Sequence, residues 1–554
     1  MRLPWIAPLV LFLSLLLGSC AALGLGGRDV PGRLLSHAST VSAPSLRAHL
    51  RFLADDLCEG RGTGARGGTL AARYLAAQLE ALGLEPGAPD GTWFQKVPLV
   101  GVETDAGGSR LEIAAEGKPP LPLALLEDAV ATDETLQEST SVDGEIVFVG
   151  HGIFAPDQKW DDFKGSKVDR RVLLVLVNEP QSADEPDLFE GRALTYYGRW
   201  TYKYEEAARR GAAGAILVHT DASAGYGWSV VRSSWGRERP YLEPEPGERR
   251  LPFAAWITEG KAREALALAG LDFDQLVQRA GRRDFAPVPT GLRLRATLAA
   301  KRRPLDTANV VGRLPGAGRR EETVVYTAHY DHLGVGLPEG GDAIYNGAVD
   351  NGSGCATVLE IARLFAALAR PPARSVYFLF PTAEEGGLRG SEFFVAHPPV
   401  SLPRIAANLN LDGVAVDGEP TEYFANGYER STLRGAVERT ARGLGVNLVP
   451  DPHPEQGFFY RSDHFNFARG HVPAVSISPG LAFAGKPEGW GEERFQDYRK
   501  NRYHRPGDEF DPRWDLEGLK KTARFAFVLG ALIADDARMP VYVPGDEFAK
   551  PGGR

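Results

Sequence analysis

The C-terminal half of this 554-residue chain alternates between strand-like and helix-like segments, and this alternation limits the folds open to it. The apolar patterns predict strands at 323–328, 375–380, 405–411 and 472–477, and helices at 353–369, 388–397, 433–444 and 516–534. This order is typical of an α/β fold in which a mainly parallel, mixed sheet is flanked by helices. Ligands of such sheets bind beyond the carboxyl ends of the strands.

A second unit is predicted inside the first. Residues 45–124, with helices at 45–57 and 68–84, combine with residues 296–545 into the main domain. Residues 125–295 form a smaller α/β-type insertion, with strands at 145–150, 171–177 and 211–218. Within it, the sequence KYEEAARRGAAGAILV resembles the protease-associated domain. The alternative is a lid of unrelated origin. Under either interpretation we expect the insertion to take no part in the chemistry of the site.

The N-terminus has the pattern of a secretory signal. Arg2 precedes an apolar stretch over residues 3–17, and small residues lead to Cys20. This arrangement resembles the lipobox of bacterial lipoproteins, which implies lipid attachment through Cys20 and, from Ala21, the outer membrane or periplasm. An ordinary signal peptide and a short membrane anchor are the alternatives. Residues 1–20 are thus the predicted signal peptide, and residues 21–44 read as a flexible tether.

Composition excludes other classes of protein. The formal net charge is -9, and acidic and basic residues are mixed along the chain, so no nucleic-acid-binding surface is predicted. Besides Cys20, the chain has only Cys58 and Cys355, which is too few for a disulfide-rich scaffold. We expect both to be small buried residues, and whether they pair is open at this point.

Five loops after predicted strands carry residues that can bind metal ions. Each residue alone has a structural explanation, such as a helix cap for the aspartate at 350. Together, two imidazoles and three carboxylates on successive strands suit zinc. We also expect Asp331 to hold the second ring nitrogen of the first histidine. The predicted ligands are His329, Asp350, Glu385, Asp412 and His504.

The local sequences closely resemble peptidase family M28, a family of zinc exopeptidases. The matching pieces are AHYDHLG, GAVDNGSG, AEEGGLRGS, NLD, RSDH and NRYH. The resemblance implies two zinc ions, with Asp350 shared between a group with His329 and Asp412 and a group with Glu385 and His504. It further implies Glu384 as the catalytic base and a cis peptide bond after Asp350.

Tyr460 is a candidate donor to the reaction intermediate under the same resemblance. Its alternative role is that of a packed aromatic residue beside Phe458 and Phe459. The expected substrates are peptides, cleaved at their N-terminal end. A carboxypeptidase, with Arg461 binding the terminal carboxylate, and a non-catalytic peptide-binding module remain open. We expect residues 483–499 to form part of the rim of the site, and the oligomeric state is not predicted.

Overall fold

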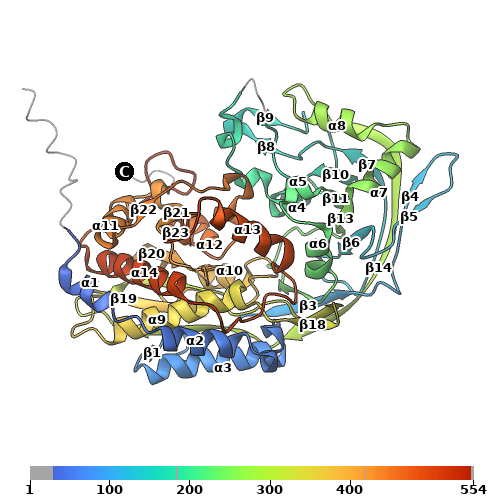
Figure 1. The fold of residues 1–554 in the computed structure, drawn as a ribbon. Coiled ribbons are helices and arrows are strands. Elements are labelled where there is room, and N and C mark those ends of the chain that lie inside the picture. Colours follow the sequence, from blue (N-terminus) through green and yellow to red (C-terminus); the bar gives the residue numbers. More distant parts are fainter. Residues whose placement is uncertain (1–28, 182–184, 417, 551–554) are drawn as a thin grey trace, which may run out of the picture.

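The structure, a computed structural model, describes residues 29–550 apart from 182–184 and 417. Two sheets dominate it, one in each of two units that lie side by side (Figure 1). The predicted signal peptide and Cys20 lie outside the described residues. None of the helices in the described ranges has the length and apolar character needed to cross a membrane.

The larger sheet confirms the predicted α/β class. Its centre is four parallel strands in the order β19 (Arg374–Phe380), β16 (Arg319–Thr327), β20 (Ile405–Asn410) and β23 (Ala474–Pro479). Antiparallel strands β15 (Ala308–Leu314) and β21 (Glu422–Asn426) flank this centre. The central strands are buried along nearly their whole length, as strands covered by helices on both faces must be.

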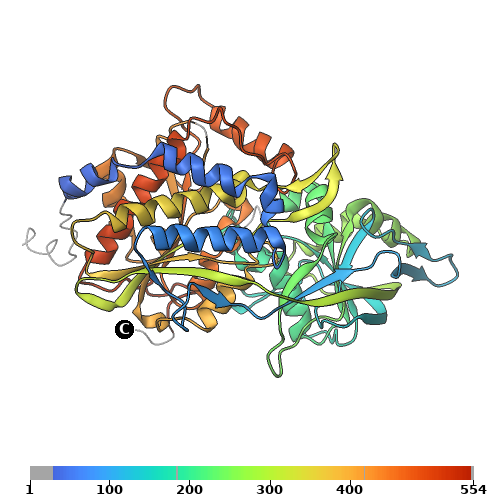
Figure 2. The same cartoon turned by 90° about the horizontal axis from the view of Figure 1, so that it is seen from below.

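Helices cover both faces of this sheet. On one face lie α2 (Ala43–Leu53), α3 (Arg66–Ala81), α9 (Gly354–Ala366) and α14 (Glu517–Asp535), which share one apolar core with the strands (Figure 2). On the other face, α10 (Arg389–Ala396) and α12 (His464–Arg469) pack over a second core that includes Phe394 and Phe467. This arrangement leaves the carboxyl ends of the central strands free to carry functional loops.

The second sheet belongs to the inserted unit, which is also α/β. Its parallel strands are β7 (Ser139–Phe148), β10 (Val172–Leu176), β11 (Gly214–His219) and β13 (Ala254–Thr258). Helices α4 (Trp200–Arg209), α6 (Trp228–Trp235), α7 (Glu259–Leu268) and α8 (Phe273–Ala280) lie against it. Its likeness to a protease-associated domain stays a prediction.

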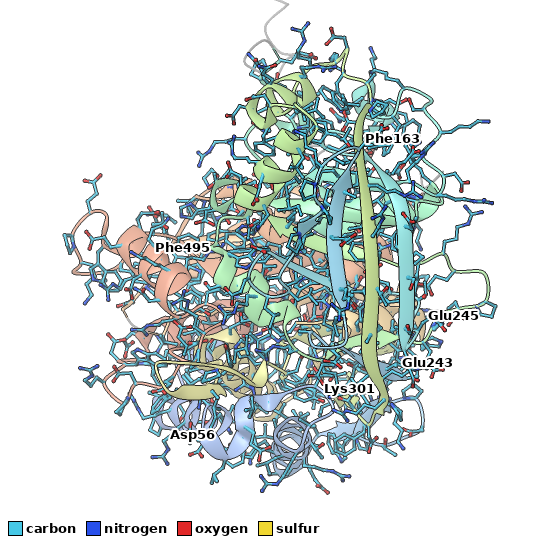
Figure 3. The ribbon with its side chains drawn as sticks, turned by 90° about the vertical axis from the view of Figure 1, so that its right-hand side faces the viewer. Asp56, Phe163, Glu243, Glu245, Lys301 and Phe495 are labelled. Atoms are coloured by element: carbon cyan, nitrogen blue, oxygen red, sulfur yellow. The ribbon has the colours of Figure 1, made fainter. Side chains whose placement is uncertain are left out.

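One long strand belongs to the second sheet along its whole length. β14 (Val288–Leu305) pairs with β7 in its first part and with β3 (Leu99–Thr104) in its last part. Figure 3 shows this strand running along the inserted unit, with Lys301 labelled near its end. The second sheet therefore takes in residues from Leu99 to Leu305, a wider span than the predicted limits of 125–295.

Part of the predicted tether is folded. Helix α1 (Gly32–Ala38) and the start of α2 lie within residues 29–44, where a flexible segment was expected. Ala38 is fully buried, and the His37 ring donates from Nε2 to the Leu364 carbonyl at 2.8 Å. The prediction was wrong for these residues because a Gly- and Ser-rich composition conceals the few apolar side chains that pack against the body.

The first long helix also begins and ends earlier than predicted. Ser42, rather than Ser45, caps α2, because its hydroxyl accepts from the Ser45 N–H at 3.2 Å. The helix ends at Leu53, and Leu57, expected on the buried face, is 72% exposed. The chain there forms a short 3-10 segment, Asp56–Arg61, that turns back toward the sheet.

Candidate metal centre

Three predicted ligands, His329, Asp350 and Asp412, lie close together. His329 follows β16, and its Nε2 atom lies 3.3 Å from Oδ1 of Asp350 and 3.4 Å from Oδ1 of Asp412. Asp412 follows β20, which is the neighbour of β16 in the sheet. The three residues can therefore hold one cation, as the sequence predicts.

The other two predicted ligands lie on the far side of Asp350. His504 Nε2 is 3.4 Å from Oδ2 of Asp350 and 3.1 Å from Oε2 of Glu385. Asp350 thus turns one oxygen to each group, which is the geometry of a bridging carboxylate. The peptide bond between Asp350 and Asn351 is cis, as the family resemblance implies.

His332 is a member of this cluster that the sequence reasoning missed. Its Nδ1 lies 2.7 Å from Oε1 of Glu385, while Oε2 of the same carboxylate faces His504. The ligand atoms of His332, Asp350 and Glu385 also lie close enough together to hold a metal ion. Nε2 of His504 approaches both carboxylates, whereas His332 contacts Glu385 through a hydrogen bond. The sequence feature that could have identified His332 is its position three residues after His329, in the same motif.

The chemistry of these residues fits bound zinc. Nε2 of His329 is buried and has no hydrogen-bond partner among the described residues, although it faces two carboxylates. A buried polar atom without a partner costs free energy, so it normally marks a site that an ion or a water completes. Imidazole nitrogen with carboxylate oxygen is a ligand mixture that zinc accepts in catalytic sites.

Asp331 supports the cluster differently from the prediction. The His329 ring donates from Nδ1 to the backbone carbonyl of Asp331 at 3.1 Å, and the nearest carboxylate oxygen is 3.8 Å away. The carboxylate instead accepts from the Thr63 hydroxyl and from the Glu384 N–H, at 3.0 and 3.1 Å. Asp331 therefore orients His329 through its carbonyl group and fixes the loop that carries Glu384.

Glu384 lies beside the cluster without taking part in its closest contacts. Its Oε2 is 3.9 Å from Nε2 of His329. Burial raises the pKa of the Glu384 carboxyl well above its ordinary value; the charge of His329 opposes this rise, and the charges of Glu385 and Asp412 reinforce it. A carboxyl group with a raised pKa can both accept a proton and return it.

Buried polar residues hold the bridging loop in place. The carboxylate of Asp508 accepts from the Val349 and Asp350 N–H groups, each at 3.0 Å. Arg61 is fully buried and donates to the carbonyls of Tyr330 and Gly347, each at 2.8 Å. Both residues act on backbone, so the position of the loop does not depend on metal alone.

Tyr460 is not brought into the cluster by any described hydrogen bond. Its hydroxyl donates to Oε1 of Glu547 at 3.2 Å, and its ring packs against Phe459 and Phe465. These contacts favour the packed-aromatic interpretation.

Cys58 and Cys355 are both buried and unpaired, as their expected structural role requires. Asp412 is held by Ser462, whose hydroxyl donates to it at 2.6 Å.

The inserted unit reaches the cluster, which corrects the expectation that it lies outside the chemistry. Oγ of Ser234, on α6, is 3.1 Å from Nδ1 of His504. Pro240, on β12 (Arg239–Leu242), packs against the loop after Glu385, where a Cβ on Gly386 would lie only 2.2 Å from its Cγ. This contact requires glycine at position 386. The insertion was misjudged because a contact between distant segments leaves no local sequence pattern.

Two hollows meet at Glu384, Glu385 and His504. The first, which we call the apolar hollow, has a volume of about 320 Å³ and is lined by Val416, Phe424, Phe483, Trp490 and Phe495 among others. The second, the insert-side hollow, has a volume of about 460 Å³ and lies between the two units. The segment 483–499 borders the apolar hollow, as expected of the rim.

Part of the larger unit is similar to a known protein family. Residues 309–529, less than half of the chain, match the model of Peptidase family M28. Leucine aminopeptidase 2 of Trichophyton rubrum is 29% identical over 215 residues, covering 36% of this chain and 40% of the relative. Endoplasmic reticulum metallopeptidase 1 of Mus musculus is 29% identical over 176 residues, covering 31% of this chain and 18% of the relative.

A solved structure extends the likeness to the whole fold. The aminopeptidase from Aneurinibacillus sp. strain AM-1 superposes with a TM-score of 0.52 at 19% identity, covering 92% of this chain and 98% of that one. At this identity the likeness concerns the fold alone. The chain spans less than half the length of these two relatives.

Proposed function

We propose that this protein is a zinc-dependent aminopeptidase that holds two zinc ions and removes N-terminal residues from peptides. The observation that carries the proposal is the shared carboxylate. The two oxygens of Asp350 face two separate sets of ligands, His329 with Asp412 and His504 with Glu385. A pair of zinc ions, when bound, lowers the pKa of water and polarises the peptide carbonyl group.

The residues of the chain supply the rest of the reaction. Glu384 takes a proton from the attacking water and later gives it to the departing amine, a double role that its raised pKa supports. Its position is set by the bond from its N–H to Asp331. The apolar hollow offers Phe424, Phe483 and Trp490 to an apolar substrate side chain.

A carboxypeptidase of the same family and a peptide-binding module remain the alternatives. The decisive assay measures hydrolysis of leucine p-nitroanilide, which carries a free amine and no carboxylate. We expect activity that a chelator abolishes and zinc restores. Hydrolysis of N-blocked peptides only, at their C-terminal end, would favour the carboxypeptidase. Tight peptide binding without turnover would favour the binding module.

The catalytic base gives a sharper test. Glu384→Gln should keep both zinc ions, because Glu384 is not among the proposed ligands, and should lose turnover by a factor of about 10² to 10⁴. Zinc content by elemental analysis and kcat on leucine p-nitroanilide check this together. Glu321→Gln is the matched control, because the Glu321 side chain is 64% exposed and lines neither hollow, and it should stay active. An active Glu384→Gln variant would remove Glu384 from the mechanism.

We also propose that the protein is exported and attached to a bacterial membrane through lipidated Cys20. The support is the sequence pattern around Cys20, with a positive start, an apolar stretch and small residues before the cysteine. Metabolic labelling with a radioactive fatty acid tests it. Label should appear in the wild-type protein and be lost in Cys20→Ser, whereas equal labelling of both would refute the anchor.

A further inference from the structure

The insert-side hollow has an unusual concentration of arginine. It opens onto Glu384, Glu385 and His504, so a molecule that occupies it lies beside the proposed zinc ligands. Arg199, from the inserted unit, and Arg461, from the catalytic unit, both line it. Arg461 and Arg499 also line the apolar hollow, and both guanidinium groups lie 5.7 Å from the centre of the Tyr226 ring.

None of these three arginines forms an ion pair with a carboxylate of the described residues. Arg461 donates to the Gln456 carbonyl at 3.3 Å, and Arg499 donates to the Gly225 carbonyl at 2.7 Å. Arg199 is less engaged still, because its Nε atom is buried and has no hydrogen-bond partner in the described chain. All three side chains are partly buried, and a partly buried positive charge without a counter-ion favours the binding of an anion.

Outside the zinc-binding cluster, four carboxylates line the same hollow, and other groups engage them. Glu205 accepts from the Tyr196 hydroxyl at 2.6 Å, Glu248 pairs with Arg250 at 2.7 Å, and Glu392 pairs with Arg389 at 2.9 Å. The fourth, Glu134, interacts with the charges of Arg389, Arg239 and Arg250. These carboxylates form no ion pair with the three arginines. Outside the zinc-binding cluster, the surplus charge that faces the hollow is positive.

The charges of the three groups act on one another. Burial lowers the pKa of Arg199 and of Arg499 to about 10, and the positive charge of Arg461 lowers both further. Burial also acts to lower the pKa of Arg461, but Tyr503, Tyr226 and Glu384 outweigh it and raise that pKa. All three therefore keep their charge at neutral pH, and Arg461 lines the hollow together with Glu384.

Local backbone adds to this positive field. Arg199 is the residue before α4, and no side chain caps that end of the helix. The first N–H groups of a helix carry partial positive charge and favour anions. Thr201, in the first turn, also lines the hollow.

We propose that Arg199 and Arg461 bind a carboxylate of the substrate in the insert-side hollow, on the leaving-group side of the bond that is cut. This inference rests on the proposed aminopeptidase function. The apolar hollow suits the side chain of the N-terminal residue, and the rest of the peptide then extends into the arginine-lined hollow. Arg is the residue best suited to a planar carboxylate, because its guanidinium group can donate two parallel hydrogen bonds.

The carboxylate can come from the C-terminus of a dipeptide or from an acidic side chain in the second position. Two pairs of substrates distinguish these sources: Leu-Ala with Leu-Ala-amide, and Leu-Asp-amide with Leu-Asn-amide. Each pair differs essentially in one negative charge. For the wild-type protein we expect kcat/KM to favour the charged member of at least one pair by about tenfold or more.

Variants connect the preference to the arginines. Arg199→Gln and Arg461→Gln should reduce the ratio of charged to neutral substrate to about twofold or less. Arg199→Lys and Arg461→Lys keep the positive charge but lose the bidentate guanidinium donor. They should therefore give intermediate ratios of kcat/KM for charged over neutral substrate. Arg209→Gln is the matched control, because Arg209 lines the same hollow but pairs with Glu206 at 2.8 Å. Zinc content and the thermal unfolding midpoint report whether each variant is folded.

The outcomes separate the inference from the function on which it rests. If leucine p-nitroanilide is hydrolysed but both substrate pairs show ratios within twofold, the carboxylate site is refuted and the aminopeptidase stands. A tenfold preference that survives in all the Arg199 and Arg461 variants would also refute the assignment. If no substrate is hydrolysed in a zinc-dependent manner, the proposed function itself fails.

Discussion

At the scale of single residues, the histidine ligands are oriented by atoms that sequence motifs do not reveal. Nδ1 of His504 has the hydroxyl of Ser234 at 3.1 Å, so the inserted unit contributes an outer contact to the proposed zinc site. Such contacts fix the ring and its tautomer. We expect Ser234→Ala to weaken zinc binding at the His504 group about tenfold, measured by competition with a chromogenic chelator.

The matched control for that measurement is Ser223→Ala. Ser223 belongs to the same inserted unit and bonds with Thr220 at 2.8 Å, away from the cluster. An affinity for zinc that is the same in Ser234→Ala and Ser223→Ala would show that the contact has no influence on the metal site.

Arg61 is the residue whose loss should cost the most stability outside the ligands. It is fully buried and donates to the carbonyls of Leu53, Tyr330 and Gly347 at 2.6, 2.8 and 2.8 Å. Arg61→Met would leave these carbonyls without partners, and we expect it to reduce the free energy of unfolding by about 3 kcal/mol or more. Urea denaturation measures this.

Arg66→Met is the control for Arg61. Its side chain is 73% exposed and pairs with Glu59 on the surface, so its loss should change the free energy of unfolding by about 0.5 kcal/mol or less. A loss below 1 kcal/mol for Arg61→Met would contradict the role assigned to the buried guanidinium group.

Which residues could be predicted follows from how local their signals are. His329, Asp350, Glu385, Asp412 and His504 each belong to a short motif, and the structure brings them together. Two of these motifs do not lie at strand ends, because His504 follows helix α13 (Trp490–Asn501) and Asp350 lies in a helical turn, Ala348–Ser353. Arg61 and Ser234 lie far from the cluster in sequence and carry no motif, so only the folded chain shows their contacts. His332 lay within a motif, but its position alone does not distinguish a ligand from a supporting residue.

At the scale of elements, hydrophobic periodicity located the catalytic helices and strands to within a few residues. The predicted helix 516–534 is observed as α14 (Glu517–Asp535), and the predicted strand 375–380 as β19 (Arg374–Phe380). The pattern is strong there because α14 and β19 are almost wholly buried. It failed for α1, whose one buried residue is Ala38; Val30 before the helix and Val41 after it are the neighbouring buried residues.

The folded part of the predicted tether should matter to stability. A chain that begins at Ser42 loses the buried surface of Val30, Ala38 and Val41 and the hydrogen bond of His37. Compared with a chain that begins at Asp29, we expect its free energy of unfolding to be about 2–4 kcal/mol lower. Equal urea midpoints for the two chains would show that α1 contributes nothing to the body.

At the scale of the whole molecule, the contacts at His504 make the two units parts of one site. Ser234 of the inserted unit lies 3.1 Å from Nδ1 of His504, and the insert-side hollow has walls from both units. Alternation of strands and helices predicted two α/β units, but β3 and the end of β14, which pair with each other in the second sheet, lie outside the predicted limits of the insertion. A pairing between strands so far apart in the sequence leaves no local pattern from which those limits could be predicted.

Zinc binding links the site to the stability of the folded chain, because the ligands come from five separate loops. A zinc concentration 100 times the dissociation constant should add about 2.7 kcal/mol to the free energy of unfolding. Wild-type protein should therefore unfold at a lower temperature after chelation. In Asp350→Ala the unfolding temperature should not respond to zinc. An unfolding temperature of the wild-type protein that is the same with and without zinc would contradict this link.

The number of zinc ions bound by ligand variants tests the central claim most directly. Elemental analysis after dialysis against limiting free zinc should find two ions per chain in the wild type, and one in both Asp412→Ala and His504→Ala. Asp350→Ala should bind none tightly, because its two oxygens face both groups. Retention of both ions by Asp350→Ala would contradict the shared carboxylate on which the account depends.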